Sequence, residues 1–113
     1  MTIITTRDSR IGKAAYVRNL RRLINQIYKI LPLKEERNPD WKKGLKSIIV
    51  EVNGLDILFG DKMSFLVLLT KLEGLFYEEE HLIFRKTIFE CIAILEELAK
   101  SCDEQSPANE EQA

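Results

Sequence analysis

The sequence predicts an all-α fold, a compact four-helix bundle, and two observations carry this prediction. Apolar residues recur at three- and four-residue spacing in four segments, which is the period of a helix with one buried face. Proline, asparagine and glycine stand between these segments, where helices end and begin. The chain has 113 residues, 45% of them hydrophobic and 31% charged, which suits one globular domain. We expect this domain to cover residues 1–102 and a disordered acidic tail to cover residues 103–113.

The first predicted helix spans residues 9–31. Asp8 or Ser9 can cap it, and Pro32 is expected to end it. Its apolar stripe consists of Tyr16, Leu20, Leu23, Ile24, Ile27 and Leu31. The basic residues on the opposite side are Arg18, Arg22 and Lys29, with Arg21 at the margin. The stripe is therefore expected to be buried and the basic side to face water or a partner.

The second predicted helix spans residues 39–53. Asn38-Pro39-Asp40 favours a helix start because it combines a capping side chain, a proline in the first turn and a carboxylate near the positive end of the helix dipole. Asn53-Gly54 is suited to close the helix through a left-handed residue. The apolar stripe between these ends consists of Trp41, Leu45, Ile48, Ile49 and Val52.

Residues 47–59 also fit a β-hairpin, which would make the fold α+β. Asn53-Gly54 is a strong two-residue turn signal, and four of the five residues 48–52 are β-branched. The hairpin register would place Glu51 opposite Asp56, and like charges in that position repel. The helix leaves only Val50 on its polar side. We therefore favour the helix and keep the hairpin as the alternative.

The third helix is predicted for residues 61–77 and the fourth for residues 79–101. Glu78-Glu79-Glu80 places three carboxylates at the favourable start of the fourth helix. Apolar residues cover nearly the whole circumference of the third helix and a wide face of the fourth, more than one buried stripe requires. We expect either a central third helix or a homodimer formed through the third and fourth helices. The residues expected in the core are Leu20, Ile27, Leu68, Leu72, Phe84, Ile88 and Leu95.

Charge is unevenly distributed along the chain. Residues 1–50 carry twelve Lys or Arg against four Asp or Glu, a formal +8, whereas residues 51–113 carry five against fourteen, a formal −9. Such a basic half suits a protein partner with an acidic surface, or the phosphates of nucleic acid. Aromatic residues for base stacking are scarce beside it, since Tyr16 and Tyr28 belong to or flank the buried stripe. The candidate partner-binding residues are Arg18, Arg21, Arg22, Lys29, Lys42, Lys43 and Lys46.

The sequence contains no recognisable catalytic, metal-binding or cofactor-binding motif. His81 is the only histidine and stands among glutamates. Gly54 and Gly60 lack the spacing and the lysine of a phosphate-binding loop. Cys91 and Cys102 lie about 16 Å apart along one predicted helix, too far for a disulfide, and they lack zinc-ligand spacing. We therefore expect no cofactor, no metal ion and no enzymatic activity.

Two further features bear on where the protein works. No segment has the roughly 20 apolar residues of a membrane span, and the first residues lack the pattern of a secretory signal, so we expect a cytoplasmic protein. The function that fits best is a non-enzymatic helical interaction protein (a regulator, adaptor or small subunit of a complex) with a basic N-terminal surface for an acidic protein partner. The alternative is a nucleic-acid-binding accessory subunit that contacts phosphates through the same surface.

Overall fold

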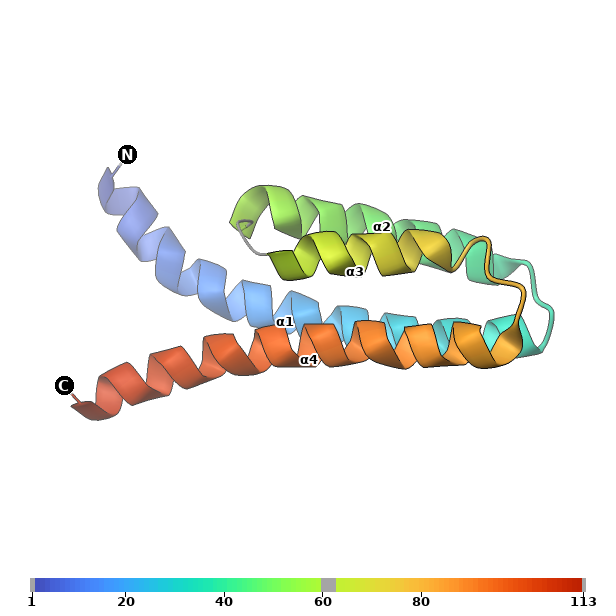
Figure 1. Ribbon diagram of the computed structural model, residues 1–113. Coiled ribbons are helices and arrows are strands. Elements are labelled where there is room, and N and C mark those ends of the chain that lie inside the picture. Colours follow the sequence, from blue (N-terminus) through green and yellow to red (C-terminus); the bar gives the residue numbers. More distant parts are fainter. Residues whose placement is uncertain (1, 60–62, 113) are drawn as a thin grey trace.

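The computed structural model is a bundle of four helices in which each helix runs antiparallel to the next (Figure 1). The structure describes the backbone of residues 2–59 and 63–112, and the side chains of residues 12–58 and 63–102. Its helices are α1 (Thr2–Glu35), α2 (Asp40–Phe59), α3 (Met63–Gly74) and α4 (His81–Gln112). α1 and α3 each pack against both α2 and α4. The predicted four-helix, all-α fold is confirmed.

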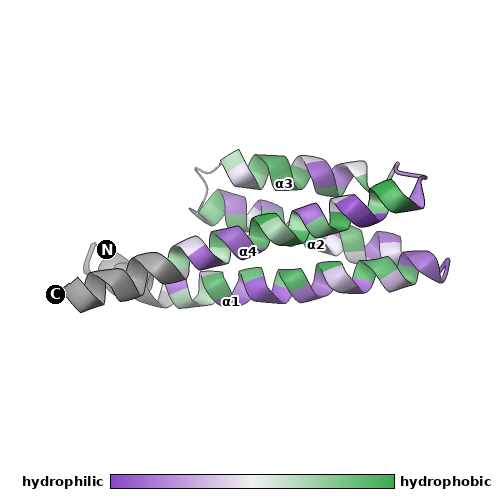
Figure 2. Cartoon of the chain, turned by 60° about the horizontal axis from the view of Figure 1, so that its bottom comes forward, coloured by the Kyte–Doolittle hydropathy of each residue, from purple (hydrophilic) through white to green (hydrophobic). Residues whose placement is uncertain are grey.

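The core of the bundle contains every residue expected there. Apolar and polar residues alternate around the helices at helical spacing (Figure 2), so each helix has an apolar side to bury. Among the described side chains, none that is polar or charged is buried. The residues Leu20, Ile27, Leu68, Leu72, Phe84, Ile88 and Leu95 are all fully buried. Burial of apolar surface is thus the main force that holds the four helices together.

The bounds of α1 correct two expectations. The helix begins at Thr2, so Asp8 and Ser9 do not start it, and the side chains of both lie outside the described residues. It also continues through Pro32 to Glu35. A proline removes only one helical hydrogen bond, and buried Leu31 keeps the surrounding turns packed on the core. That packing outweighs the missing bond.

α1 ends at Glu35, and two residues later Arg37 is a non-glycine residue in the left-handed region with a φ of 60°. The Arg37 N–H donates to the carbonyl of Lys34 at 3.1 Å, and the Asn38 N–H donates to the carbonyl of Leu33 at 2.9 Å. This pair of bonds is the Schellman pattern, which satisfies carbonyls at a helix end. The chain is thereby turned directly into α2.

α2 begins as predicted but ends later. Asn38 caps it, since its Oδ1 accepts the N–H of Asp40 at 3.0 Å. The helix then passes through Asn53-Gly54 to Phe59, so the expected end at residue 53 is wrong. Val52 and Leu55, three residues apart, are both buried, and this packing extends the helix past the glycine.

The alternative β-hairpin over residues 47–59 is also wrong. The whole segment is part of α2, and residues 2–59 and 63–112 contain no strand. A short apolar run fits a strand and a helix equally well, and the neighbouring helices decide between them. Here the helix has α1 on one side and α3 on the other.

The third and fourth helices differ from the predicted ranges at their ends. α3 stops at Gly74, and residues 75–77 form a turn in which the Tyr77 N–H donates to the Gly74 carbonyl at 3.1 Å. α4 begins directly after the three glutamates, and its bounds extend to Gln112. The side chains of residues 103–113 lie outside the described residues, so the disordered tail, and with it the domain limit at residue 102, stays a prediction.

The apolar residues that cover nearly the whole circumference of α3 are not explained by a central position in the bundle. α3 packs against α2 and α4 only, and one side of it faces outward. Met63, Leu66 and Val67 on that side are exposed, whereas Phe65, Leu68 and Leu72 are buried. The expectation of a central third helix is therefore wrong, and the outer apolar side of α3 is open.

Two glycines of α2 allow a matched test of the helix assignment. Gly54→Ala is expected to raise the free energy of unfolding by about 0.5–1 kcal/mol, because alanine favours the helix. A Cβ at Gly54 meets no heavy atom within 4 Å. At Gly44 the same atom would lie 2.9 Å from Ile30 Cδ1, where α1 and α2 approach closely. Gly44→Ala should therefore raise the free energy of unfolding less than Gly54→Ala does, or lower it. Urea unfolding measures both changes, and an equal rise for the two variants would contradict the close approach of α1 and α2 at Gly44.

Candidate functional site

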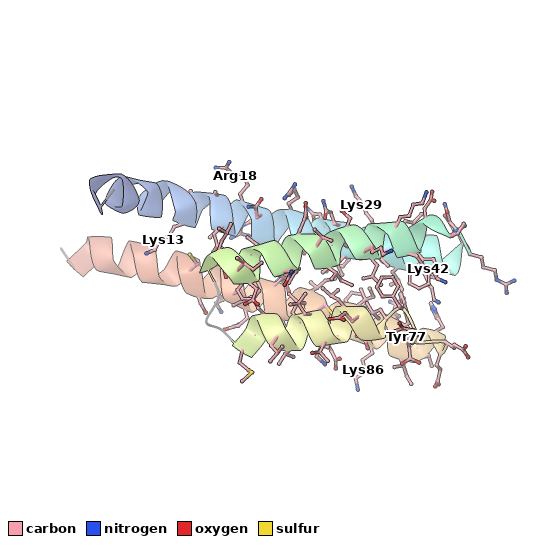
Figure 3. All side chains as sticks on the ribbon, turned by 90° about the horizontal axis from the view of Figure 1, so that it is seen from above. Lys13, Arg18, Lys29, Lys42, Tyr77 and Lys86 are labelled. Carbon is pink, nitrogen blue, oxygen red and sulfur yellow. The ribbon has the colours of Figure 1, made fainter. Side chains whose placement is uncertain are left out.

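The predicted basic residues are all exposed, but the structure divides them into two groups. We call the first group, Arg18, Arg21, Arg22 and Lys29, the α1 basic face. The second group is Lys42, Lys43 and Lys46 of α2. Figure 3 shows Arg18 and Lys29 pointing outward from α1, whereas Lys42 lies at the end of the bundle near Tyr77. The seven residues therefore form two surfaces with different neighbours.

Arg22 of the α1 basic face is already engaged. Arg22 Nη2 lies 3.3 Å from Oε1 of Glu51 on α2 and donates to Asn19 Oδ1 at 3.1 Å. Arg18 and Lys29 form no ion pair with any residue whose side chain is described. Arg22 thus helps to join α1 to α2, while Arg18 and Lys29 keep their charges available.

An exposed aromatic pair lies on the side of α1 that meets α4. The rings of Tyr28 and Phe89 are edge-to-face with centroids 6.0 Å apart, and their exposed fractions are 46% and 40%. The guanidinium carbon of Arg85 lies 5.4 Å from the centre of the Phe89 ring. The sequence placed Tyr28 at the edge of the buried stripe and gave no sign of this pair, because Phe89 is 61 residues further along the chain. Aromatic and arginine side chains in this combination are typical of protein interfaces.

The second group of basic residues lines an open pocket of about 480 Å³. Its walls are Lys42, Lys43 and Lys46 from α2, together with Phe76 and Tyr77 from the connection between α3 and α4. We call it the lysine–tyrosine pocket. The sequence pattern indicated the three lysines, but it assigned both aromatics to the third helix and predicted few aromatics near the basic residues. For the three α2 lysines the prediction of few neighbouring aromatics is therefore wrong, because Phe76 and Tyr77 line the same pocket.

Trp41 supports this pocket from inside the bundle. Its ring lies 6.3 Å from Phe76 and is perpendicular to Phe84 at 5.6 Å. Lys34 Nζ lies 4.4 Å from the centre of the indole, and Lys42 Nζ lies 5.7 Å from it. Both ammonium groups are within cation–π range. Trp41 therefore contacts a pocket lysine and a pocket aromatic at once.

His81 does not belong to a metal-binding cluster in the described part of the chain. Its Nε2 lies 3.2 Å from Glu35 Oε2, and both side chains are exposed. Glu78 instead accepts the N–H of Glu80 at 3.2 Å and so caps the start of α4. The described residues include no cluster of three His, Cys, Asp or Glu side chains that could hold a metal ion.

Cys91 is buried in the core, and both cysteines are free. Burial raises the pKa of the Cys91 thiol to about 12, and the nearby Lys71 ammonium opposes this only in part. Because the thiolate is the nucleophile, a thiol with this pKa is inert at neutral pH. Cys91 therefore acts as a small apolar residue.

Two further observations concern membrane spanning and similarity to known proteins. Of the described helices, none combines the length and the apolar character needed to cross a bilayer. Comparison with known proteins finds no matching family model, no matching curated protein and no matching solved structure.

The burial and low reactivity of the Cys91 thiol can be tested directly. Iodoacetamide at pH 8 should leave Cys91 unmodified in the folded protein, since the thiolate is scarce and buried. Mass spectrometry of the peptide that contains Cys91 measures the modified fraction, and the same treatment in denaturant supplies the reference for full labelling. Labelling of Cys91 at the same rate in both samples would contradict its place in the core.

Proposed function

We propose that the protein is a non-enzymatic, cytoplasmic interaction protein whose α1 basic face binds a protein partner with an acidic surface. The observation that carries this proposal is the exposed Tyr28–Phe89 pair beside Arg85 and the α1 basic face. The free state of both cysteines fits a reducing compartment.

The two kinds of residue on this face have different parts in the proposal. Exposed ion pairs contribute little to affinity by themselves. In this proposal Arg18 and Lys29 therefore act mainly on the rate of association and on the choice of partner. The aromatic rings supply the apolar contact that a stable interface needs at its centre. A partner that carries carboxylates around an apolar patch would satisfy both.

The proposal predicts that charge reversal on α1 abolishes partner capture. Arg18→Glu/Lys29→Glu should retain the wild-type thermal midpoint, because neither side chain pairs with a described residue. We leave Arg22 unchanged, since a glutamate there would face Glu51. The measurement is affinity capture on the full chain from nuclease-treated native lysate, with quantification of the proteins retained.

Two controls sharpen this test. Lys86→Glu changes an exposed lysine that projects from the opposite side of the molecule (Figure 3), so it should retain the same proteins as the wild type. Tyr28→Ala should lose them without any change of charge. Equal retention by all variants would contradict the proposal, and proteins retained only when the nuclease treatment is omitted would favour the nucleic-acid alternative.

We further propose that a second copy of the chain covers the outer apolar side of α3. Leu66 on that side is 58% exposed. Met63, one helical turn before it, and Val67, the next residue, are exposed as well. On α4, Leu82 and Ile83 are exposed as well. The three exposed apolar residues within positions 63–67 of α3 favour an interface over isolated surface positions.

Self-association through this side should depend on Leu66. Sedimentation equilibrium over a range of concentrations is expected to give a dimer for the wild type and a monomer for Leu66→Glu, because a buried unpaired carboxylate opposes association. Lys29→Glu, an exposed change on α1, which does not pack against α3, is the control and should remain dimeric. A wild type that stays monomeric at every concentration would refute the homodimer.

A further inference from the structure

The lysine–tyrosine pocket has the size and the position of a ligand site. Its volume of about 480 Å³ lies within the range of small-molecule sites. One of its walls is the α3–α4 connection, which lies at the same end of the bundle as the α1–α2 connection (Figure 1). The walls come from two elements that are separated in the sequence, and the aromatic core behind them fixes their separation in space. The pocket is therefore a feature of the folded bundle.

The three lysines make the pocket electrostatically suited to an anion. Lys42 and Lys46 lie one helical turn apart, and Lys43 lies beside them on the same exposed side of α2. Lys43 and Lys46 form no ion pair with any described residue, and the ammonium of Lys42 lies over the Trp41 ring. Three lysines that line one pocket repel one another, and a phosphate bound among them would relieve that repulsion.

The glutamates that follow the pocket do not supply that neutralisation. Glu78 is turned back onto the N–H of Glu80, where it stabilises the start of α4. Glu35, on the neighbouring end of α1, contacts His81. The pocket lysines thus keep their positive charge beside an acidic connection.

Tyr77 adds a feature that an anion alone does not require. Its side chain is 86% exposed, the most exposed of the large apolar and aromatic side chains described. Its backbone is held by the bond from its N–H to the Gly74 carbonyl, and Phe76 next to it packs toward Trp41. An exposed phenol ring beside three lysines can offer its face to a planar group.

We propose that the lysine–tyrosine pocket binds one nucleotide unit of a single-stranded nucleic acid, with the phosphate on the lysines and the base stacked on Tyr77. Single-strand sites combine a basic groove for the backbone with aromatic rings for the bases. An acidic peptide would use the lysines but would leave Tyr77 without a planar partner. This site goes beyond the proposed protein interaction, and it uses none of the residues of the α1 basic face.

The chain contains its own reporter for binding here. Trp41 is the only tryptophan, and it contacts both Lys42 and Phe76 of the pocket. A ligand that draws the Lys42 ammonium away from the indole should change the tryptophan emission. Titration of the full chain with a fluorescein-labelled ten-nucleotide oligo-dU, followed by anisotropy, gives affinity, and an unlabelled strand gives the Trp41 signal.

The proposal predicts a specific pattern among variants. Tyr77→Ala should weaken oligonucleotide binding about 10-fold or more, and Tyr77→Phe should retain it, because stacking needs the ring and not the hydroxyl. Lys43→Gln/Lys46→Gln should lower the slope of log affinity against log salt by about 0.7 for each phosphate that is no longer neutralised by an ammonium group. All three positions are exposed in the wild type, so the thermal midpoints should stay unchanged.

Matched controls separate this site from the α1 basic face. Tyr28→Ala and Lys86→Gln should bind the oligonucleotide as the wild type does, whereas Tyr28→Ala should lose the protein partner. The proposal is overturned if the wild type does not bind the strand at low salt or if Tyr77→Ala binds it equally well. It is also overturned if polyglutamate of the same charge competes as strongly as the strand, or if free uridine monophosphate binds as tightly as the ten-nucleotide strand.

Discussion

The packing of Trp41 is the constraint on which the arrangement of both surfaces depends. From α2 its indole reaches Phe84 of α4 at 5.6 Å and Phe76 of the α3–α4 connection at 6.3 Å, and the ammonium of Lys34 of α1 lies 4.4 Å from its centre. One side chain thus joins α1, α4 and the α3–α4 connection to α2. Because aromatic packing of this kind has geometry as well as area, it sets how the two connections lie relative to each other. The walls of the lysine–tyrosine pocket follow from that placement.

The same packing separates the two candidate binding surfaces. The side of α2 that carries Trp41 faces the core, so Lys42, Lys43 and Lys46 must lie on its outer side. On α1 the buried stripe leaves Tyr28 next to α4 and turns Arg22 toward Glu51 of α2. Helical periodicity therefore divides one basic half of the sequence into two surfaces. Their aromatic neighbours come from different helices, and this difference gives the two surfaces different chemistry.

The sequence predicts the bundle well because burial at helical spacing is a local pattern. Leu20, Leu72 and Ile88 could be assigned to the core from their neighbours three and four residues away. The helix ends were harder, since Pro32 and Gly54 are breakers whose effect depends on what packs around them. The lysine–tyrosine pocket could not be found from local pattern, because Tyr77 and Lys46 meet only after folding. An up-and-down bundle does bring its first and third connections to one end. That topological rule was the one sequence-level indication that residues near the two connections would lie close together.

The exposure of the aromatics decides what each surface can recognise. Tyr28 meets Phe89 edge to face, so part of the pair is already covered and its remaining area suits the apolar patch of another protein. Tyr77 has no such ring partner among the described residues, and at 86% exposure its face is open to a flat ring. Lysines accompany both tyrosines, and they attract carboxylates and phosphates alike. Under the two proposals, charge brings an anionic partner to either surface, and the exposure of the tyrosine beside it selects between a protein side chain and a nucleic-acid base.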